Sequence, residues 1–344
     1  MEQHVILQKS DFDNFIERLA KIQKLIAPVK KGVKNFTFQE IKSAKDIALR
    51  YIPTILPPKK YFMPSREELV EYNKSESQWN AVLEYDKIII FGVHTCDLAG
   101  IQCLNMVFTE KPKDINYIVR KNKIGIIGLE CNDYCDEYAS CALMDNDFPN
   151  GGYDLFFTEL KDHFIAHINT LIGEEMIEKT KVFKKATEEN MEELKSVRQR
   201  KKNIFKNEVE IKHKDLKLLF EKSFASSVWQ DLDKRCLACG NCTNVCPTCY
   251  CFDIFDEINL DFNSGMHYRR WDSCQNEEFA KVAGGENFRK ARGARQRHRY
   301  MRKFHYPVEK YSRYFCTGCG RCSRTCMAKI NLKETINSLI KEAK

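Results

Sequence analysis

Two short stretches of the chain carry cysteine at the same spacing, C-x2-C-x2-C-x3-C. They read CLACGNCTNVC over residues 236–246 and CTGCGRCSRTC over residues 316–326. In two-cluster ferredoxins with this spacing, the first three thiolates of a run bind one [4Fe–4S] cluster and the fourth binds the other cluster. A zinc ribbon needs only C-x2-C pairs, so it leaves two cysteines of each run unexplained. The spacing therefore predicts two [4Fe–4S] clusters.

The ferredoxin pattern also predicts how the two runs share their ligands. We expect the first cluster to be bound by Cys236, Cys239, Cys242 and Cys326. We expect the second cluster to be bound by Cys316, Cys319, Cys322 and Cys246. Gly240 and Gly320 lie inside the runs, where a residue without a side chain lets the backbone approach a cluster closely. Pro247 follows the last cysteine of the first run, as it does in ferredoxins, whereas Met327 occupies that place in the second run.

Three cysteines near the first run have no predicted ligand role. These are Cys249, Cys251 and Cys274. A buried free cysteine behaves as a small apolar residue. We therefore expect all three to pack or to form hydrogen bonds beside a cluster.

A further group of cysteines follows two predicted strands in the N-terminal half. Residues 88–108 predict a buried strand, a tight turn and a helix, and residues 123–135 predict a second strand that leads into a turn. Turns at the carboxyl ends of neighbouring strands in an open α/β sheet converge on one crevice. Four thiols are candidates for a third [4Fe–4S] cluster there, with buried structural thiols as the alternative: Cys96, Cys131, Cys135 and Cys141. His94 and Asp97 flank Cys96 and are alternative ligands, groups that orient ligands, or reactive groups of an enzyme site.

Length and pattern divide the chain into two domains. A single hydrophobic core stops growing near about 250–300 residues, and this chain has 344 residues, of which 43% are hydrophobic. Strands mixed with helices predict an α/β domain over 1–172, which begins with a helix that carries Phe12 and Phe15 on one face. Residues 173–226 are charged and helix-prone and predict a helical linker. The wide separation of the cysteine runs predicts an all-helical ferredoxin-type domain over 227–344.

Common catalytic and nucleotide-binding signatures are absent from the sequence. No GxGxxG follows a predicted strand and no GxxxxGK[ST] occurs, so we expect no flavin or nucleotide in this chain. No Ser/His/Asp signature is found either, and we predict no catalytic residue. No stretch approaches about 18 consecutive apolar residues and the N-terminus has no apolar leader, which predicts a cytoplasmic protein without a membrane span. In a reducing compartment, sixteen cysteines indicate metal or redox chemistry.

Residues 267–313 form a basic block, with thirteen Lys and Arg against five acidic residues. Basic and aromatic residues together can bind nucleic acid, so an iron–sulfur nucleic-acid-binding protein is the alternative function. A [4Fe–4S] cluster with four thiolates is itself anionic, and nearby Arg and Lys would offset its charge and raise its reduction potential. We favour this explanation for part of the block and expect the rest to dock an acidic partner or to face water.

Six strings of residues, taken in order, resemble one family. They are PPKKYFMP at 57–64, FGVHTCDLAGI, CLACGNCTNVCPTCYC, RRWDSCQ, VAGGENFR and CTGCGRC. Together they resemble the iron–sulfur beta subunits of cytosolic nickel–iron hydrogenases (sulfhydrogenases) and, more loosely, the corresponding subunit of anaerobic sulfite reductase. The resemblance implies an electron-transfer subunit of an anaerobic oxidoreductase complex. It implies two partners, one that binds flavin or NAD(P) and one that holds a catalytic metal, of the hydrogenase or sulfite/sulfur reductase type.

The family's site residues can be carried over onto matching positions. Its two ferredoxin-type motifs fall on the eight cysteines of the two runs. Its additional cysteine segment matches Cys96, Cys131 and Cys141. Members of the family place the last two cysteines of that segment one residue apart, whereas Cys135 and Cys141 are six apart. The resemblance therefore implies a third cluster and leaves its fourth ligand open between Cys135, Asp97 and Asp136.

Overall fold

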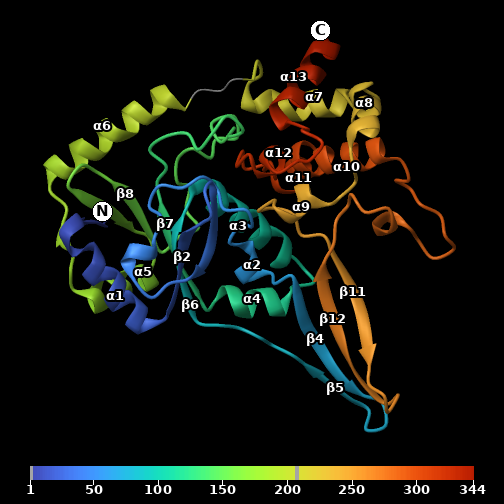
Figure 1. Ribbon diagram of the computed structural model, residues 1–344, viewed down its shortest axis with the longest axis horizontal. Coiled ribbons are helices and arrows are strands. Elements are labelled where there is room, and N and C mark those ends of the chain that lie inside the picture. Colours follow the sequence, from blue (N-terminus) through green and yellow to red (C-terminus); the bar gives the residue numbers. More distant parts are fainter. Residues whose placement is uncertain (1–2, 206–208) are drawn as a thin grey trace.

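Continuous apolar stretches form the centre of an eight-stranded sheet. The computed structural model describes residues 3–205 and 209–344. The strand order is β10-β1-β9-β8-β7-β6-β2-β3, with parallel pairing from β2 through β6 and β7 to β8 and antiparallel pairing elsewhere (Figure 1). The strands are β1 (Gln3–Gln8), β2 (Lys24–Lys31), β3 (Asn35–Glu40), β6 (Ile88–Val93), β7 (Ile124–Leu129), β8 (Leu155–Glu159), β9 (His163–Ile168) and β10 (Lys184–Lys185). β6 and β7 are buried along their whole length, because helices cover both faces of the sheet there.

Five helices cover the two faces of this sheet. They are α1 (Phe12–Ile22) and α5 (Leu171–Thr180) on one face, and α2 (Lys59–Phe62), α3 (Thr95–Phe108) and α4 (Ile115–Lys121) on the other. Successive residues of β6 point to opposite faces, so Ile89 packs in the core beneath α1 while Ile90 packs in the core beneath α3. The face predicted for α1 is confirmed, since Phe12 and Phe15 are both buried.

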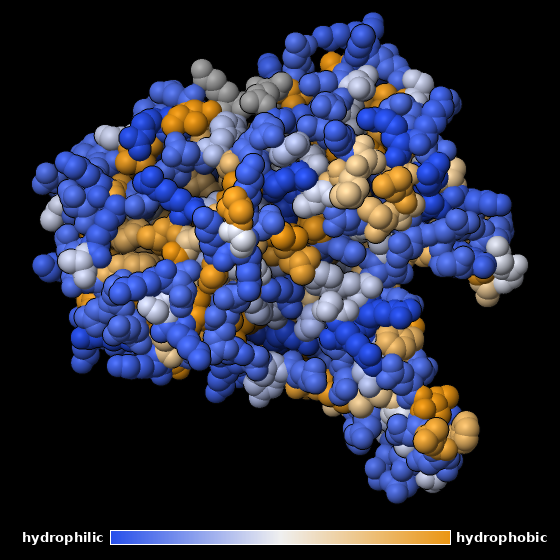
Figure 2. Space-filling model, viewed as in Figure 1, coloured by the Kyte–Doolittle hydropathy of each residue, from blue (hydrophilic) through white to orange (hydrophobic). Residues whose placement is uncertain are grey.

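A four-stranded antiparallel sheet projects from the body of the molecule (Figure 1). Its order is β11-β12-β4-β5, so a hairpin from the N-terminal half pairs with one from the C-terminal half. The strands are β4 (Arg66–Asn73), β5 (Gln78–Ala81), β11 (Phe252–Ile258) and β12 (Ser264–Trp271). At the inner end, the buried carboxylate of Glu67 pairs with Arg120 at 2.8 Å and with Arg269 at 2.7 Å. At the outer end, apolar side chains that include Leu260 and Phe262 are exposed (Figure 2).

This second hairpin corrects the expectation of an all-helical domain over 227–344. β11 and β12 lie inside that range and pair along seven residues. The turn between them is closed by Asp261, whose carboxylate accepts hydrogen bonds from the backbone N–H groups of Asn263 and Ser264 at 2.9 Å each. The backbone groups on the other edge of β12 form hydrogen bonds with β4. The C-terminal half therefore contributes to a sheet as well as to the helices.

The other C-terminal elements form a helical layer that carries both cysteine runs. The helices are α7 (Leu216–Lys222), α8 (Val228–Arg235), α9 (Asn241–Asn244), α10 (Arg292–Phe304), α11 (Tyr306–Tyr311), α12 (Arg321–Arg324) and α13 (Leu332–Ala343). Trp229, Tyr300 and Phe304 fill the core between them. None of the helices in the described ranges has the length and the apolar run needed to cross a membrane.

Residues 173–226, predicted as a helical linker, are divided between the two parts. β10 pairs with β1 at the edge of the large sheet. α6 (Glu188–Ile204) buries Leu194 against Leu160 and Ile165 of the same part. α7 packs instead in the helical core, through Leu216 and Phe220. Most of the stretch therefore packs on one part or the other.

Candidate iron–sulfur sites

The two cysteine runs have the same backbone course. Each contains two residues in the left-handed region, Ala238 and Gly240 in the first run (φ 52° and 73°) and Gly318 and Gly320 in the second (φ 72° for both). A one-turn helix follows, α9 in the first run and α12 in the second. Backbone in which left-handed and right-handed residues succeed one another turns its N–H groups toward one concave side, as in many iron–sulfur sites. Both loops therefore have the form that an anionic cluster requires.

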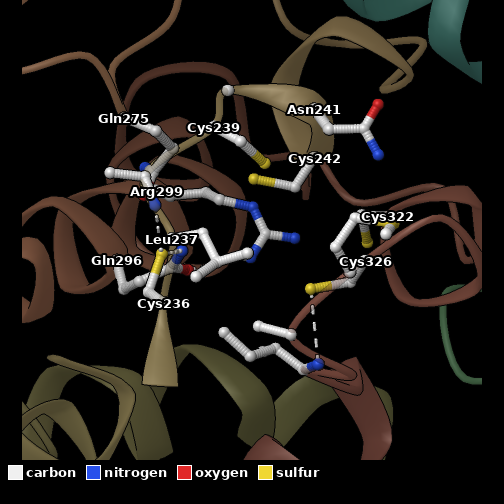
Figure 3. Close-up of a pocket in the computed structure, with 15 residues that line it drawn as sticks. Cys236, Leu237, Cys239, Asn241, Cys242, Gln275, Gln296, Arg299, Cys322 and Cys326 are labelled. Atoms are coloured by element: carbon white, nitrogen blue, oxygen red, sulfur yellow. Dashed lines mark hydrogen bonds between the residues drawn. The ribbon is translucent and has the colours of Figure 1, made fainter. Parts of the chain in front are cut away.

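Thiols from both runs meet around one cavity. One cavity is lined by five cysteines, Cys236, Cys239, Cys242, Cys322 and Cys326. Figure 3 shows these sulfur atoms on opposite sides of the space, with the guanidinium of Arg299 between them. The four thiols predicted to bind the first cluster thus come together, although one of them belongs to the distant run.

Hydrogen bonds to sulfur surround this cavity. The side-chain amide of Gln296 donates to Sγ of Cys236 at 3.0 Å, and the backbone N–H of Ile330 donates to Sγ of Cys326 at 3.4 Å. The backbone N–H of Ala238 also donates to Sγ of Cys236, at 3.3 Å. Donors aimed at sulfur suit thiolate ligands, and hydrogen bonds to cluster sulfurs tune the reduction potential. Four thiols with such donors fit a [4Fe–4S] cluster.

The thiols predicted for the second cluster are crowded as well. Burial and the nearby thiols of Cys322, Cys319 and Cys246 raise the pKa of Cys316. Burial raises the pKa of Cys319 to about 11, with Arg321 opposing the rise and Cys246 adding to it. Thiols in such surroundings stay protonated at neutral pH unless a metal holds the thiolate. The charges of the other three predicted thiols thus each act on the pKa of Cys316.

Buried cations of the basic block lie among these thiols. Arg299 and Lys303 of α10 are both buried. Burial opposes their charge, but Cys242 and Cys322 hold the pKa of Arg299 well above its usual value, and Cys246 and Cys249 do the same for Lys303. This arrangement agrees with the expectation that part of the block offsets thiolate and cluster charge.

A third group of ligand atoms lies at the carboxyl ends of β6 and β7. The ring nitrogens of His94 and the sulfur atoms of Cys131 and Cys135 offer ligand atoms that lie within 4.8 Å of one another. The imidazole stacks on Tyr51 with a centroid distance of 3.9 Å, and its buried Nδ1 has no hydrogen-bond partner among the described residues. Cys96 is buried at the start of α3, where burial first, and then nearby charges that include Cys135, raise the pKa of its thiol.

Cys141 and Glu130 lie near this third group of ligand atoms. Burial first, and then the charge of Cys135, raise the pKa of Cys141 to about 12. Glu130 precedes Cys131, and its buried carboxylate pairs with Lys201 of α6 at 3.1 Å and with Arg198 at 3.2 Å. Two of the four predicted thiols, Cys131 and Cys135, therefore lie close together with the imidazole of His94. Cys96 and Cys141 are near enough to Cys135 for its charge to raise their pKa values.

Asp97 and Asp136, the two carboxylates proposed as alternative ligands, each form an ion pair with an arginine. Asp97 forms a two-point ion pair with Arg321 at 2.6 and 2.7 Å, and both side chains are fully buried. Asp136 pairs with Arg324 across the domain boundary as well. Sequence reasoning missed these pairs because the arginines lie in the second cysteine run, far from the aspartates along the chain. Of the three alternative ligands for the third site, His94 is the one whose ligand atom lies close to Cys131 and Cys135.

The second run packs directly against the segment that carries Cys135 and Cys141. The backbone N–H of Ser140 donates to the carbonyl of Gly318 at 2.8 Å. A Cβ atom on Gly318 would lie 2.4 Å from the carbonyl carbon and oxygen of Ser140, and one on Gly320 would lie 2.8 Å from the carbonyl group of Tyr138. Both contacts require glycine, so the second and third groups of ligands form one continuous structure.

Comparison with known proteins identifies an iron–sulfur domain that contains both cysteine runs. A family model for the 4Fe-4S dicluster domain matches residues 235–330, which contain both runs. The chain is also 35% identical, over 331 residues, to sulfhydrogenase 2 subunit beta of Pyrococcus furiosus, and the alignment covers 95% of each chain. The chain belongs to the sulfhydrogenase beta-subunit family. As a member, it carries a 4Fe-4S dicluster domain in its C-terminal half, and its ferredoxin-type cysteines lie inside that domain.

The sulfhydrogenase beta-subunit fold also brings together the three cysteines without a predicted ligand role. Cys249, Cys251 and Cys274 line one cavity together with Arg302 and Lys303. The carbonyl of Cys249 accepts a hydrogen bond from the buried Lys59 at 2.9 Å, so part of the expectation of packing and hydrogen bonding holds for this residue. The sequence could not indicate that the three thiols share a cavity, because Cys274 reaches it only through the pairing of β11 with β12.

Proposed function

We propose that this chain relays electrons through [4Fe–4S] clusters between two partner subunits of an oxidoreductase complex. The observation that carries the proposal is the meeting of Cys326 with Cys236, Cys239 and Cys242 around one cavity. When bound, a [4Fe–4S] cluster supplies a one-electron redox centre whose potential depends on charge, hydrogen bonds and exposure. The chain offers such ligands without a nucleotide-binding signature, which favours relay over catalysis.

The chain's own residues would hold and tune the clusters. The first cluster would use Cys236, Cys239, Cys242 and Cys326, and the second Cys316, Cys319, Cys322 and Cys246. Arg299 and Lys303 are buried beside these thiols and would offset the negative charge of clusters with thiolate ligands. Gln296 and the loop amides would hold the sulfur ligands in place through hydrogen bonds.

A third cluster at the edge of the sheet would extend the relay. Its proposed ligands are the thiols of Cys96, Cys131, Cys135 and Cys141, with His94, which lies close to Cys131 and Cys135, as the alternative to one of them. The contact of Ser140 with Gly318 supports a relay that continues from the second site to this one. Cys131→Ala should lower the iron content by about four atoms per chain if Cys131 binds a cubane. An unchanged iron content would exclude this assignment.

The first site supports a docking position for a partner. Cys239 is exposed, and the neighbouring side chains of Leu237 and Met327 are 61% and 79% exposed. Apolar side chains around an exposed redox site favour a partner surface that would exclude water there. We propose that one of two partners docks here. One partner would bind flavin or NAD(P), and the other would hold a catalytic metal, as in a hydrogenase or a sulfur reductase.

Metal analysis and spectroscopy of anaerobically purified protein test the proposal. Two clusters require about eight iron atoms per chain and three require about twelve. Reduction should produce electron paramagnetic resonance signals of [4Fe–4S] clusters. Zinc in place of iron, with no such signal after reduction, would overturn the proposal.

The alternative of nucleic-acid binding has less support. Arg295, Arg299 and Lys303 of the basic block are buried, so they are not available to phosphate groups. Arg269 is buried too, in its ion pairs with Glu67 and Asp114. Much of the basic block thus has partners within the protein.

A further inference from the structure

Cys251 and Cys274 meet at the inner end of the projecting sheet. Cys251 directly precedes β11, and Cys274 follows β12 by three residues. Phe252 pairs with Trp271 in the ladder, and the backbone N–H of Asp272 donates to the carbonyl of Cys251 at 3.0 Å. Both cysteines line the same cavity. Strand pairing therefore holds together two thiols to which neither predicted cluster assigns a role.

The two thiols differ in their access to solvent. Cys251 is half-buried, whereas Cys274 is buried, with 5% of its surface exposed. The side-chain amide of Gln275 donates to Sγ of Cys274 at 3.4 Å. Contact with Cys274 lowers the pKa of Cys251, whereas contact with Cys251 and burial raise that of Cys274. Unequal access and unequal acidity are the features of a pair in which one thiol attacks and the other resolves.

The cavity that both thiols line has a positive wall. Arg299, Arg302 and Lys303 of α10 line it. His298 lines it too, but burial and the charge of Arg289 lower its pKa to about 4, so its imidazole is neutral at pH 7. The guanidinium of Arg302 lies 5.3 Å from the ring centroid of Tyr250, which positions it beside the thiols. The wall would favour an anionic molecule in this cavity.

We propose that Cys251 and Cys274 form a thiol–disulfide exchange site for small anionic disulfides. The thiolate of Cys251 attacks one sulfur of the small disulfide, forms a mixed disulfide and expels one thiolate. The thiol of Cys274 then loses its proton and attacks Sγ of Cys251, which forms the Cys251–Cys274 disulfide and expels the second thiolate. One disulfide is reduced to two thiols while two cysteines are oxidised, so electrons balance without another reactant.

A metal site does not account for this pair. Cys249 shares the cavity, which therefore has three thiols in its lining. A cubane needs four ligands, and Cys246, whose charge acts on Cys249, is assigned to the second cluster. The geometry thus points to thiol chemistry.

The exchange site can be tested on the cluster-loaded full chain under anaerobic conditions. The probe is 5,5′-dithiobis(2-nitrobenzoate), an anionic disulfide whose released thiolate is coloured. After an acid quench and alkylation, mass spectrometry should find a Cys251–Cys274 disulfide in the unaltered chain. Cys274→Ser should stop at a mixed disulfide on Cys251, and Cys251→Ser should give neither product. Cys103→Ser, a change in a buried thiol of α3, should behave as the unaltered chain does.

The charge of the probe tests the positive wall separately. Cystamine, a cationic disulfide, should react with the pair at least about ten-fold more slowly than the anionic probe. Arg302→Gln should reduce this difference, whereas Arg297→Gln should not, because Arg297 lies on the same helix against Phe224. Absence of the internal disulfide, a first adduct on Cys274, equal rates for both probes, or a fall in iron or zinc content in Cys251→Ser would each overturn the proposal.

Discussion

The two cysteine runs share a backbone and differ in what surrounds them. In the first run, Leu237 lies 61% exposed and Cys239 faces solvent. At the equivalent place in the second run, Thr317 is 2% exposed and the following Gly318 packs on Ser140. One loop design therefore serves at the surface in one copy and at a domain boundary in the other. The residues between the cysteines, which the spacing leaves free, decide which role each copy has.

The position after the second left-handed residue of each run shows the same divergence. Asn241 in the first run donates to the carbonyl of Thr325 at 2.8 Å and so joins the two runs. Arg321 in the second run is fully buried, where it pairs with Asp97 and donates to the carbonyl of Thr54 at 2.6 Å. A neutral link holds the runs to each other, and a charged link holds them to the large sheet.

Loss of a shared ligand should have the largest effect and tests whether the runs are crossed. Cys326→Ala should lower the iron content by about four atoms per chain, because a cubane rarely survives without one thiolate ligand. The electron paramagnetic resonance signal that disappears should be the one lost in Cys236→Ala. If it matches the signal lost in Cys316→Ala instead, each run binds its own cluster and the crossed assignment is wrong.

Removal of the charged link should destabilise the protein more than removal of the neutral one. Arg321→Ala leaves Asp97 buried without its partner and should cost about 3–5 kcal/mol. Asn241→Ala removes one hydrogen bond and should cost about 1 kcal/mol. Denaturant unfolding of the two cluster-loaded variants measures the difference between their free energies of unfolding. Equal shifts in the midpoint would show that Arg321 does not hold the two parts together.

Alanine at one left-handed glycine of each run should separate backbone strain from packing. Gly318 and Gly240 have nearly the same φ, 72° and 73°, so a left-handed alanine costs about the same at both. A Cβ atom on Gly318 would lie 2.4 Å from Ser140, whereas one on Gly240 would lie 3.1 Å from Ser273. Gly318→Ala should therefore be less stable than Gly240→Ala by about 1–3 kcal/mol. Similar unfolding curves would contradict the close packing of the second run.

The smallest expected effect concerns the exposed rim of the first run. Met327→Glu places a charge beside Cys239 and should weaken binding of the proposed partner by about ten-fold, which corresponds to about 1.4 kcal/mol. Leu260→Glu, at the exposed tip of the projecting sheet, is the matched control because its side chain is 95% exposed and distant from the thiols. Titration of the separated partner subunits against each variant measures the affinity. A larger loss for Leu260→Glu would move the docking surface to the projecting sheet.

Local patterns predicted much of the fold and the convergence of the site. The spacing of Phe12, Phe15 and their neighbours predicted α1, and the apolar run at 88–93 predicted β6. Spacing also selected thiols that meet around one cavity, although the ligand sets themselves stay predictions. β11 and β12 were missed because their stability depends on β4, which no local pattern connects to them. The pairs of Asp97 with Arg321 and of Asp136 with Arg324 were missed for the same reason.

The hydrogen bond from Ser140 to Gly318 has a consequence for the maturation of this protein. It joins the segment that carries Cys141 to the loop that carries Cys316 and Cys319. Neither segment can take its final shape before the large sheet and the helical layer have closed on each other. If the two sites bind clusters as proposed, we expect iron to reach them late in biogenesis, and a chain that is cut between the two parts should acquire iron at its first site alone.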